Sequence, residues 1–446
     1  MRGERTGSPF PGRVRTRQGG GLRRWAGMTF AAFRVPNFRL YCAGQAVSLV
    51  GTWMQGVAQS WLVLELTGSA TLLGVVVAAQ FVPVLVAAPY GGLVADRMDK
   101  RRLLLVTQAT SAMLAGLLGW LTVAHVVRVW MVVGFALALG AVNAVDTPTR
   151  QSFVPELVGP RLLGNAVSLN SVMVSGARAV GPAVAGLLIA EVGAGMCFLL
   201  NAVSFVAVLL ALAVMHPDRR YAASPVLRAR GQLVAGFRYA RRIPGIRTPL
   251  LMMAVVGTLA YEFQVVLPVL ATSGLHGDAT IFGYLTSAMG VGAVFGGLVV
   301  AARGRAGLIP LVIVAGCFAA GLGVATLAPS LPAELVALAI VGVASTAFLA
   351  IGNTTLQLIC APPFRGRVMA LWTVAFLGST PVGGPIIGVI VEHAGPRAGL
   401  AVGAVACLVA AVLGLLSMSR VPAGQRLLPR ATPPLAGAPP TEAERI

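Results

Sequence analysis

The stretch GLVADRMDKRR, residues 92–102, decides the fold, because it is a short charged segment between two long apolar runs. The run before it covers roughly residues 70–95, and the run after it covers roughly residues 103–124. A helix needs ~20 apolar residues to cross a bilayer, and both runs reach that length. The stretch therefore predicts two membrane-spanning helices joined by a tight basic turn.

Runs of this kind recur along the whole chain. In the first half they lie at roughly 38–66, 70–95, 103–124, 129–149, 163–190 and 196–215. In the second half they lie at roughly 248–272, 279–302, 308–328, 332–360, 366–391 and 398–418. The sequence therefore predicts an all-α membrane protein of about 12 transmembrane helices, in two six-helix bundles, with both termini on one side of the bilayer.

Composition supports the same fold class. Apolar residues make up 57% of the 446 positions and charged residues 11%, whereas soluble domains carry about 25% charged residues. The net charge of +20 comes from basic loops. All Lys and Arg residues except Arg128, Arg178 and Arg397 fall in segments that we assign to the cytoplasm. This positive-inside bias predicts a multi-pass plasma-membrane protein with cytoplasmic termini, and it explains the charge without a nucleic-acid partner.

The chain divides into five predicted parts. A basic cytoplasmic tail (1–37) precedes the first bundle (38–215), and a linker (216–247) precedes the second bundle (248–418). Within the linker, apolar residues alternate with arginines from Leu233 to Tyr239, which predicts an interfacial amphipathic helix. The Pro- and Ala-rich end (419–446) is predicted to be disordered in the cytoplasm.

The two predicted bundles also share sequence features. The string GGLV occurs at 91–94 and again at 296–299, and Gly-Pro occurs at 181–182 and at 384–385. Glu191 and Glu392 follow the two Gly-Pro pairs at similar distances. Three matches at nearly one offset indicate an internal duplication, which places a substrate site at mid-depth between the halves.

Residues 92–102 resemble the signature G-x-x-x-D-R-x-G-R-R of the major facilitator superfamily. The matching residues are Gly92, Asp96, Arg97, Lys100 and Arg101, and Asp99 stands where the superfamily usually has glycine. The glycine allows two helices to approach closely, and Asp96 can pair with a base or cap a neighbouring helix. The second half has no acid at the corresponding place, so Asp96 is the single acidic latch of the predicted pair.

The run GARAVGPAVAG, residues 176–186, resembles the antiporter signature that ends in G-P-x-x-G-G. Gly181 and Pro182 match it, whereas Ala185 replaces the first closing glycine. Stretches at 37–45, 146–150, 262–268 and 365–369 are similar to the drug- and siderophore-exporting branch of the same superfamily. The resemblance implies a secondary transporter that exports small amphipathic molecules by alternating access and proton antiport. It implies a monomer without a cofactor.

Polar residues within the predicted spans are the candidate site residues, because a charge at mid-bilayer costs ~2.5–3.5 kcal/mol on insertion scales. Glu262 and Asp146 are the candidates for proton coupling, since burial favours the neutral form of a carboxyl group. Asp146 and Arg150 lie one helical turn apart, which indicates a local ion pair. Arg178 is interpreted as a helix-packing tether or, alternatively, a functional base. The sequence does not show whether it pairs with Glu262.

A polar stripe runs along the first predicted span at helical spacing, and the fourth, seventh and tenth spans also carry polar residues. In the superfamily these four spans line the central cavity. The predicted cavity residues are Gln45, Ser48, Thr52, Gln55, Gln59, Asn143, Gln264, Asn353 and Gln357. The alternative for the first span is hydrogen bonding between helices.

Other function classes have less support. Lys100 is the single lysine and follows Asp99, so the chain holds no Walker A loop for an ATP-driven pump. The five cysteines lie singly in apolar runs, and no metal-ligand spacing occurs. Histidines at loops and span ends give no hydrolase motif, so we expect no enzyme activity. An importer of a small metabolite or sugar on the same fold is the main alternative, and a non-transporting scaffold is the third.

Overall fold

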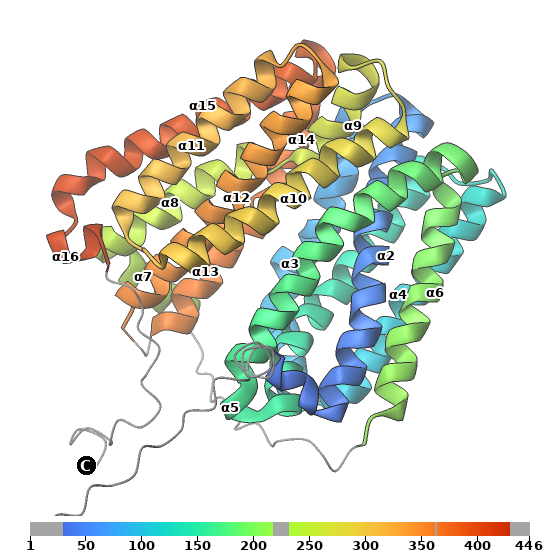
Figure 1. Cartoon of the computed structure of the whole chain (residues 1–446), viewed down its shortest axis with the longest axis horizontal. Helices are drawn as coiled ribbons and strands as arrows, with labels where there is room; N and C mark the ends of the chain where they lie inside the picture. Colours follow the sequence, from blue (N-terminus) through green and yellow to red (C-terminus); the bar gives the residue numbers. More distant parts are fainter. Residues whose placement is uncertain (1–29, 217–231, 362–363, 429–446) are drawn as a thin grey trace, which may run out of the picture.

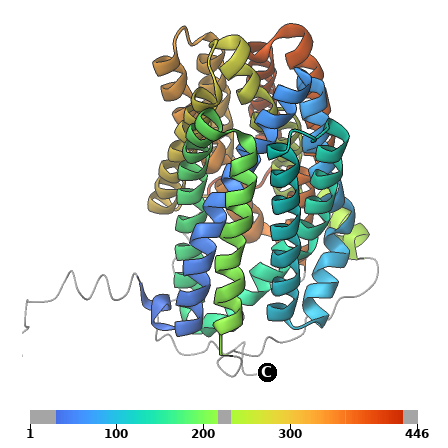
Figure 2. The ribbon, with the colours of Figure 1, turned by 90° about the vertical axis from the view of Figure 1, so that its right-hand side faces the viewer.

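The computed structural model describes residues 30–216, 232–361 and 364–428. The first bundle follows a short turn, η1 (Ala31–Arg34), and its long helices share nearly parallel axes (Figure 2). They are α2 (Pro36–Thr67), α3 (Ala70–Arg97), α4 (Lys100–Val123), α5 (Val129–Val192) and α6 (Ala194–Val214).

The second bundle contains shorter helical pieces because two of its spans are interrupted. They are α8 (Pro244–Leu259), α9 (Phe263–Val269), η2 (Leu270–Gly274), α10 (Ala279–Arg303), α11 (Leu308–Leu327), α12 (Leu331–Ile359), α13 (Arg365–Leu377), α14 (Thr380–Ala394) and α15 (Pro396–Ser417). Three small elements, α7 (Gln232–Arg242), η4 (Met418–Arg420) and α16 (Ala423–Arg426), lie outside the bundle (Figure 1).

The predicted all-α fold with two bundles is confirmed. Ten candidate spans occur among the described residues by length and hydropathy. One of them, α5, contains two crossings that meet at Gly159, and α2, at 32 residues, is long enough to cross but carries the polar stripe. The described part of the chain therefore has helices for twelve crossings, as the apolar runs predict.

The junction of the fourth and fifth spans differs from the prediction. The helix continues through residues 150–162, which the apolar runs leave as a loop, and its helical geometry is interrupted at Gly159 (φ 68°, ψ 174°). Pro160 disfavours the helical conformation in the residue before it, and glycine alone takes a positive φ without strain. The two residues thus mark the boundary that hydropathy misplaced.

The seventh and eleventh spans are broken rather than continuous. The former breaks between Leu259 and Phe263, and the latter between Leu377 and Thr380. The two breaks lie next to each other, because a Cβ on Gly257 would lie 2.8 Å from the Ser379 hydroxyl. Interrupted helices expose backbone groups that are tolerated at membrane depth only inside protein or beside a cavity.

The internal duplication is visible in the backbone. Gly193 and Gly395 each end one helix and start the next, with nearly identical dihedral angles (φ 83°, ψ 165° and φ 85°, ψ 165°). The two seams between the bundles also correspond, since α3 packs on α14 and α10 packs on α5. The two halves are therefore related in conformation as well as in sequence.

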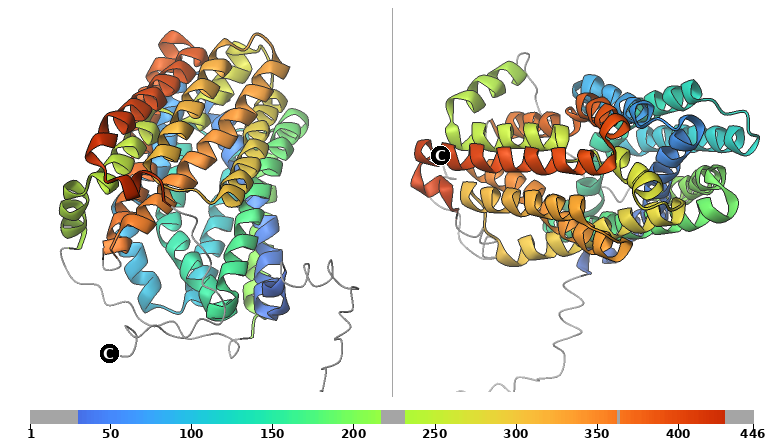
Figure 3. Two further views of the ribbon diagram at one scale, coloured as in Figure 1. Left: turned by 60° about the vertical axis from the view of Figure 1, so that its left-hand side comes forward. Right: turned by 90° about the horizontal axis from the view of Figure 1, so that it is seen from above.

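The molecule has two ends that differ in charge, a basic end and a far end. The basic end carries the start of α2 and the turn at Met98–Asp99, and the far end carries the turns at Gly68 and Gly395. Between the bundles, close approaches run from the far end to mid-depth. A Cβ on Gly388 would lie 2.6 Å from Ala70 O, and a Cβ on Gly283 would lie 2.7 Å from Pro182 O. Towards the basic end the bundle axes diverge (Figures 1 and 3).

Parts of the linker and tail are structured. Tyr239 of α7 stacks on Phe364 with ring centroids 4.2 Å apart, so this helix docks on the second bundle, while Phe237 is 60% exposed. The predicted disorder from 419 is corrected for residues up to 428, because Leu428 N donates to Ala306 O. Residues 1–29, 217–231 and 429–446 lie outside the described part, and the predicted domain boundaries stay predictions.

Candidate functional site

Glu262 lies at the break in the seventh span, 3% exposed, at the seam between the bundles. Its carboxylate accepts a hydrogen bond from the Thr380 side chain, whereas its Oε1 has no partner. Gly383 and Gly384 of α14 flank the carboxylate, and Gly384 also packs on the backbone of Gly74 in α3. A carboxyl group with few partners is thus buried where the two bundles meet.

Arg178 lies at mid-depth on the other seam and does not pair with Glu262. Its guanidinium carbon lies 5.4 Å from the centre of the Trp53 ring. Tyr261, from the other bundle, lies within electrostatic range of the guanidinium. Within the described residues it makes no hydrogen bond to a carbonyl or carboxylate, so the contacts of a packing tether are not present there.

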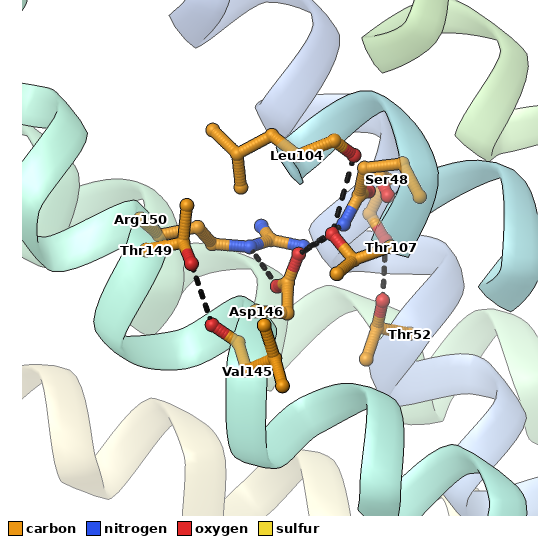
Figure 4. Close-up of polar contacts among 9 residues, drawn as sticks. Ser48, Thr52, Leu104, Thr107, Val145, Asp146, Thr149 and Arg150 are labelled. Carbon is orange, nitrogen blue, oxygen red and sulfur yellow. Dashed lines mark hydrogen bonds and ion pairs between the residues drawn. The ribbon is translucent and has the colours of Figure 1, made fainter. Parts of the chain in front are cut away.

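The predicted ion pair between Asp146 and Arg150 is confirmed. Asp146 is 4% exposed, and its Oδ1 accepts hydrogen bonds from Thr107 Oγ1 (2.6 Å) and Gln108 Nε2 (2.8 Å). Figure 4 shows Thr107 and Arg150 converging on the carboxylate, with Ser48 and Thr52 of α2 nearby. Three side chains from α4 and α5 thus hold the carboxylate, which suits a structural ion pair.

The signature loop ties α4 to its neighbours. Lys100 forms a 2.6 Å ion pair with Glu156 of α5, and Arg101 Nε donates to Leu212 O of α6 (2.6 Å). Asp99, the departure from the superfamily pattern, accepts from Arg102 N (2.9 Å) and caps the start of α4. The surroundings of Gly92 and the side chain of Asp96 lie outside the described set, and Arg97 is exposed, so the latch role of Asp96 stays a prediction.

Two residues of the polar stripe of α2 form hydrogen bonds to other helices. Asn201 of α6 donates to Gln55 Oε1 (2.6 Å), and Gln59 donates to Gln80 of α3 (3.2 Å). These contacts fit the alternative of interhelical hydrogen bonding. Among the other predicted cavity residues, Gln45 and Ser48 are buried, Asn143 and Asn353 are partly exposed, and Thr52, Gln264 and Gln357 are exposed.

In the antiporter-like run, Gly181 and Pro182 contact different helices. A Cβ on Gly181 would lie 2.8 Å from Val50 O, so this glycine brings α5 against α2 within one bundle. Pro182 O instead faces Gly283 of α10, in the other bundle. Small residues at this place therefore serve both internal packing and the seam.

Comparison with known proteins shows the family. A family model described as "Transmembrane secretion effector" matches residues 27–437. The chain belongs to this family of major facilitator transporters. It is 30% identical to the staphyloferrin A transporter of Staphylococcus aureus, in a match spanning 56% of the chain and 63% of that relative. It is 28% identical to the multidrug efflux pump Tap of Mycolicibacterium fortuitum (77% and 86% covered). It is 27% identical to the enterobactin exporter EntS of Shigella boydii (85% and 91% covered).

Solved structures confirm the facilitator fold. A bacterial homologue of the lysosomal transporter Spinster superposes with a TM-score of 0.65 at 15% identity, covering 85% of this chain and 97% of that one. A D-xylose–proton symporter superposes with a TM-score of 0.65 at 16% identity, covering 86% and 98%. The protein is therefore a multi-pass transporter of the bacterial inner membrane with a small-molecule substrate, and not an enzyme.

Sequence reasoning missed an acidic contact of the transporter at the far end. Glu392 of α14 accepts hydrogen bonds from Ser69 Oγ (2.6 Å) and Thr71 N (2.8 Å), which lie at the start of α3 in the other bundle. A carboxylate at a helix N-terminus is favoured by the free backbone N–H groups there. The comparison of the two halves singled out Glu392, but it did not predict the contacts with Ser69 and Thr71.

Further polar residues of the transporter carried no sequence signal. Gln80, Gln108 and Asn201 supply partners to the predicted residues from neighbouring helices. Glu334, in the first turn of α12, is fully buried, and both of its carboxylate oxygens lack a hydrogen-bond partner. The contacts of Gln80, Gln108 and Asn201 join different helices, so spacing along one helix does not predict them.

Proposed function

We propose that the transporter exports small amphipathic molecules from the cytoplasm in exchange for protons, by alternating access of one central site to the two sides of the membrane. The observation that carries the proposal is the position of Glu262, a buried carboxyl group at the seam that closes the far end. Efflux proteins among the relatives support the outward direction.

The proposed orientation places the basic end in the cytoplasm. At the far end of the described chain, the basic residues are Arg128 and Arg397, whereas the turns at the basic end are rich in arginine. The positive-inside rule assigns such an end to the cytoplasm. The structure then corresponds to an inward-facing state, closed at the far end.

The proposed cycle uses the cost of burying a charge. Neutral Glu262 is compatible with a closed far seam, because burial disfavours the carboxylate. Loss of its proton to the cytoplasm leaves a charge at the seam, which favours opening towards the far side with substrate on board. Protonation from the outside then restores the closed seam. One proton moves in as substrate moves out.

Direction is tested by comparing a deletion strain with its parent. Export predicts more substrate inside the deletion strain, less in the medium and greater sensitivity to amphipathic toxins. Complementation by the wild-type gene reverses these changes, and complementation by Glu262→Gln does not. A deletion strain that takes up less substrate would instead support the importer alternative. Arg128→Gln, which changes an exposed arginine at the far end, is the matched control and should complement fully.

A further inference from the structure

The side chain of Arg178 carries a charge at membrane depth and has no acidic partner within the described part of the chain. Its residue is partly buried near the middle of the second crossing of α5. Neither of the ion pairs among the described residues involves it. A guanidinium carries five N–H donors in a fixed plane and stays charged at any physiological pH. Such a group at this depth needs a compensating partner.

Protein groups around Arg178 supply part of this compensation. The guanidinium lies over the Trp53 ring at 5.4 Å, and cation–π contacts contribute about 0.5–2 kcal/mol. Trp53 is held in place because its Cβ packs on Gly181 of the antiporter-like run. The ring stabilises the charge through its face, but it accepts no conventional hydrogen bond from the N–H groups. The donors therefore stay available to a ligand.

Both bundles contribute to the surroundings of Arg178. Its own carbonyl oxygen packs on Gly290 of α10, where the seam reaches mid-depth. Tyr261 of the second bundle, beside the break in the seventh span, lies within electrostatic range of the guanidinium. The Tyr261 hydroxyl donates to Ser345 O (2.6 Å), and its ring packs edge-on against Phe318 and Phe376. The guanidinium thus lies over an aromatic ring of the first bundle, with Tyr261 of the second bundle within electrostatic range.

We propose that Arg178, with Trp53 and Tyr261, forms a subsite for the anionic group of an amphipathic substrate, so that the transported molecules are organic anions carrying a carboxylate or an equivalent oxyanion. A planar guanidinium binds such groups through two parallel hydrogen bonds. The aromatic rings suit an apolar or aromatic body attached to the anion. This inference rests on the proposed transport function and names its substrate class.

The test uses two dyes with the same xanthene skeleton and opposite charge. Binding of fluorescein, an anionic carboxylate, and of rhodamine 6G, a cation, is measured by fluorescence polarisation on the purified full chain in phosphatidylcholine nanodiscs. The wild type should bind fluorescein more tightly. Arg178→Gln should weaken fluorescein binding about tenfold or more and leave rhodamine 6G within about twofold. Arg178→Lys, which keeps the charge without the planar fork, should give an intermediate affinity.

Two controls distinguish an anion subsite at Arg178 from a general effect of net charge and from a lipid site. Arg128→Gln changes the net charge equally at an exposed far-end position and should leave both affinities unchanged. Adding phosphatidylglycerol tests for a lipid headgroup. Weaker fluorescein binding through competition at Arg178 would mean that lipid occupies the subsite in the membrane, which contradicts a substrate role.

Three results would overturn the inference: no fluorescein binding by the wild type, equal affinities in Arg178→Gln and wild type, or equal losses for both dyes. If Arg178→Gln is not monodisperse, Arg178→Lys replaces it in the test. The ratio of its affinities for fluorescein and rhodamine 6G should fall if Arg178 binds the anion, whereas a purely structural role predicts the wild-type ratio. Binding in nanodiscs requires no transport. A chain that binds fluorescein through Arg178 but does not move it would therefore refute the proposed export and keep the anion subsite.

Discussion

The Glu392 carboxylate of α14 accepts a 2.6 Å hydrogen bond from the Ser69 hydroxyl of α3, across the seam between the two bundles. The same oxygen accepts from Thr71 N, so one side chain of the second bundle caps a helix of the first. At the related position of the other seam, Glu191 is exposed, and Asp278 already caps the start of α10. Among the residues that the structure describes, side-chain hydrogen bonds therefore latch the far end on one seam and not on the other.

This asymmetry predicts that Glu392→Gln raises the population that is open at the far end, because the neutral amide is a weaker acceptor at a helix N-terminus. Glu191→Gln, the matched control, should leave the population unchanged. Spin labels at Leu66 and Leu327, in a background without the five native cysteines, report the distance across the far end. Equal distance distributions in the two variants would contradict the latch. Because the contact is exposed, high salt should weaken it in the wild type.

Close backbone packing at the same seam gives a second prediction. A Cβ on Gly388 would lie 2.6 Å from Ala70 O, and neither backbone can move without separating the bundles. Overpacking of this kind costs about 1–3 kcal/mol. Gly388→Ala should therefore open the far end and reduce transport by roughly tenfold. Gly297→Ala, where an added Cβ meets nothing within 4 Å, should transport like the wild type. Comparable loss in both variants would indicate a general effect of alanine.

The Asp146–Arg150 pair is predicted to act in stability. Asp146→Ala leaves a largely buried guanidinium without its partner, which costs about 3–5 kcal/mol, towards the lower end because the Arg150 side chain is 24% exposed. The melting temperature of the purified protein should fall clearly. The double variant Asp146→Ala/Arg150→Met should recover much of the loss, since neither charge is then unpaired. Arg161→Gln, an exposed arginine on the same helix, should be neutral.

A different result would assign Asp146 to proton transfer and not to stability. If Asp146→Asn melts like the wild type but no longer couples substrate movement to protons, Asp146 is a proton carrier, and the structural interpretation is wrong. The hydrogen bonds from Thr107 and Gln108 make this outcome unexpected, because they hold the carboxylate in a packing contact between α4 and α5.

Much of the fold is predictable from sequence, because lipid imposes long apolar runs and closed backbone hydrogen bonding. The Asp146–Arg150 pair was also predictable, since helical residues four apart face each other. The hydropathy profile did not predict the interruptions at Gly159 and beside Glu262, where the backbone leaves the helical conformation within apolar stretches. Conformation at such points depends on packing between helices, which a hydropathy profile does not contain.

The site was less predictable for a related reason. The α2 stripe was correctly identified as polar, yet its partners Asn201 and Gln80 come from other helices, and one sequence does not pair them. Glu392 and Ser69 lie 323 positions apart, so their contact exists only after the bundles assemble. Arg178 could be singled out by its charge, but the structure was needed to show that it faces Trp53 and not Glu262.

The most direct test of the central claim is coupled exchange in inverted membrane vesicles with an acidic interior. Uptake of an amphipathic dye and the luminal pH are recorded together. For the wild type we expect the dye to accumulate in the lumen while the luminal pH rises, because protons leave as substrate enters. Glu262→Gln should show neither accumulation nor alkalinisation. Dye accumulation and proton release in Glu262→Gln at the wild-type ratio, or net movement of dye out of the lumen in the wild type, would contradict the account.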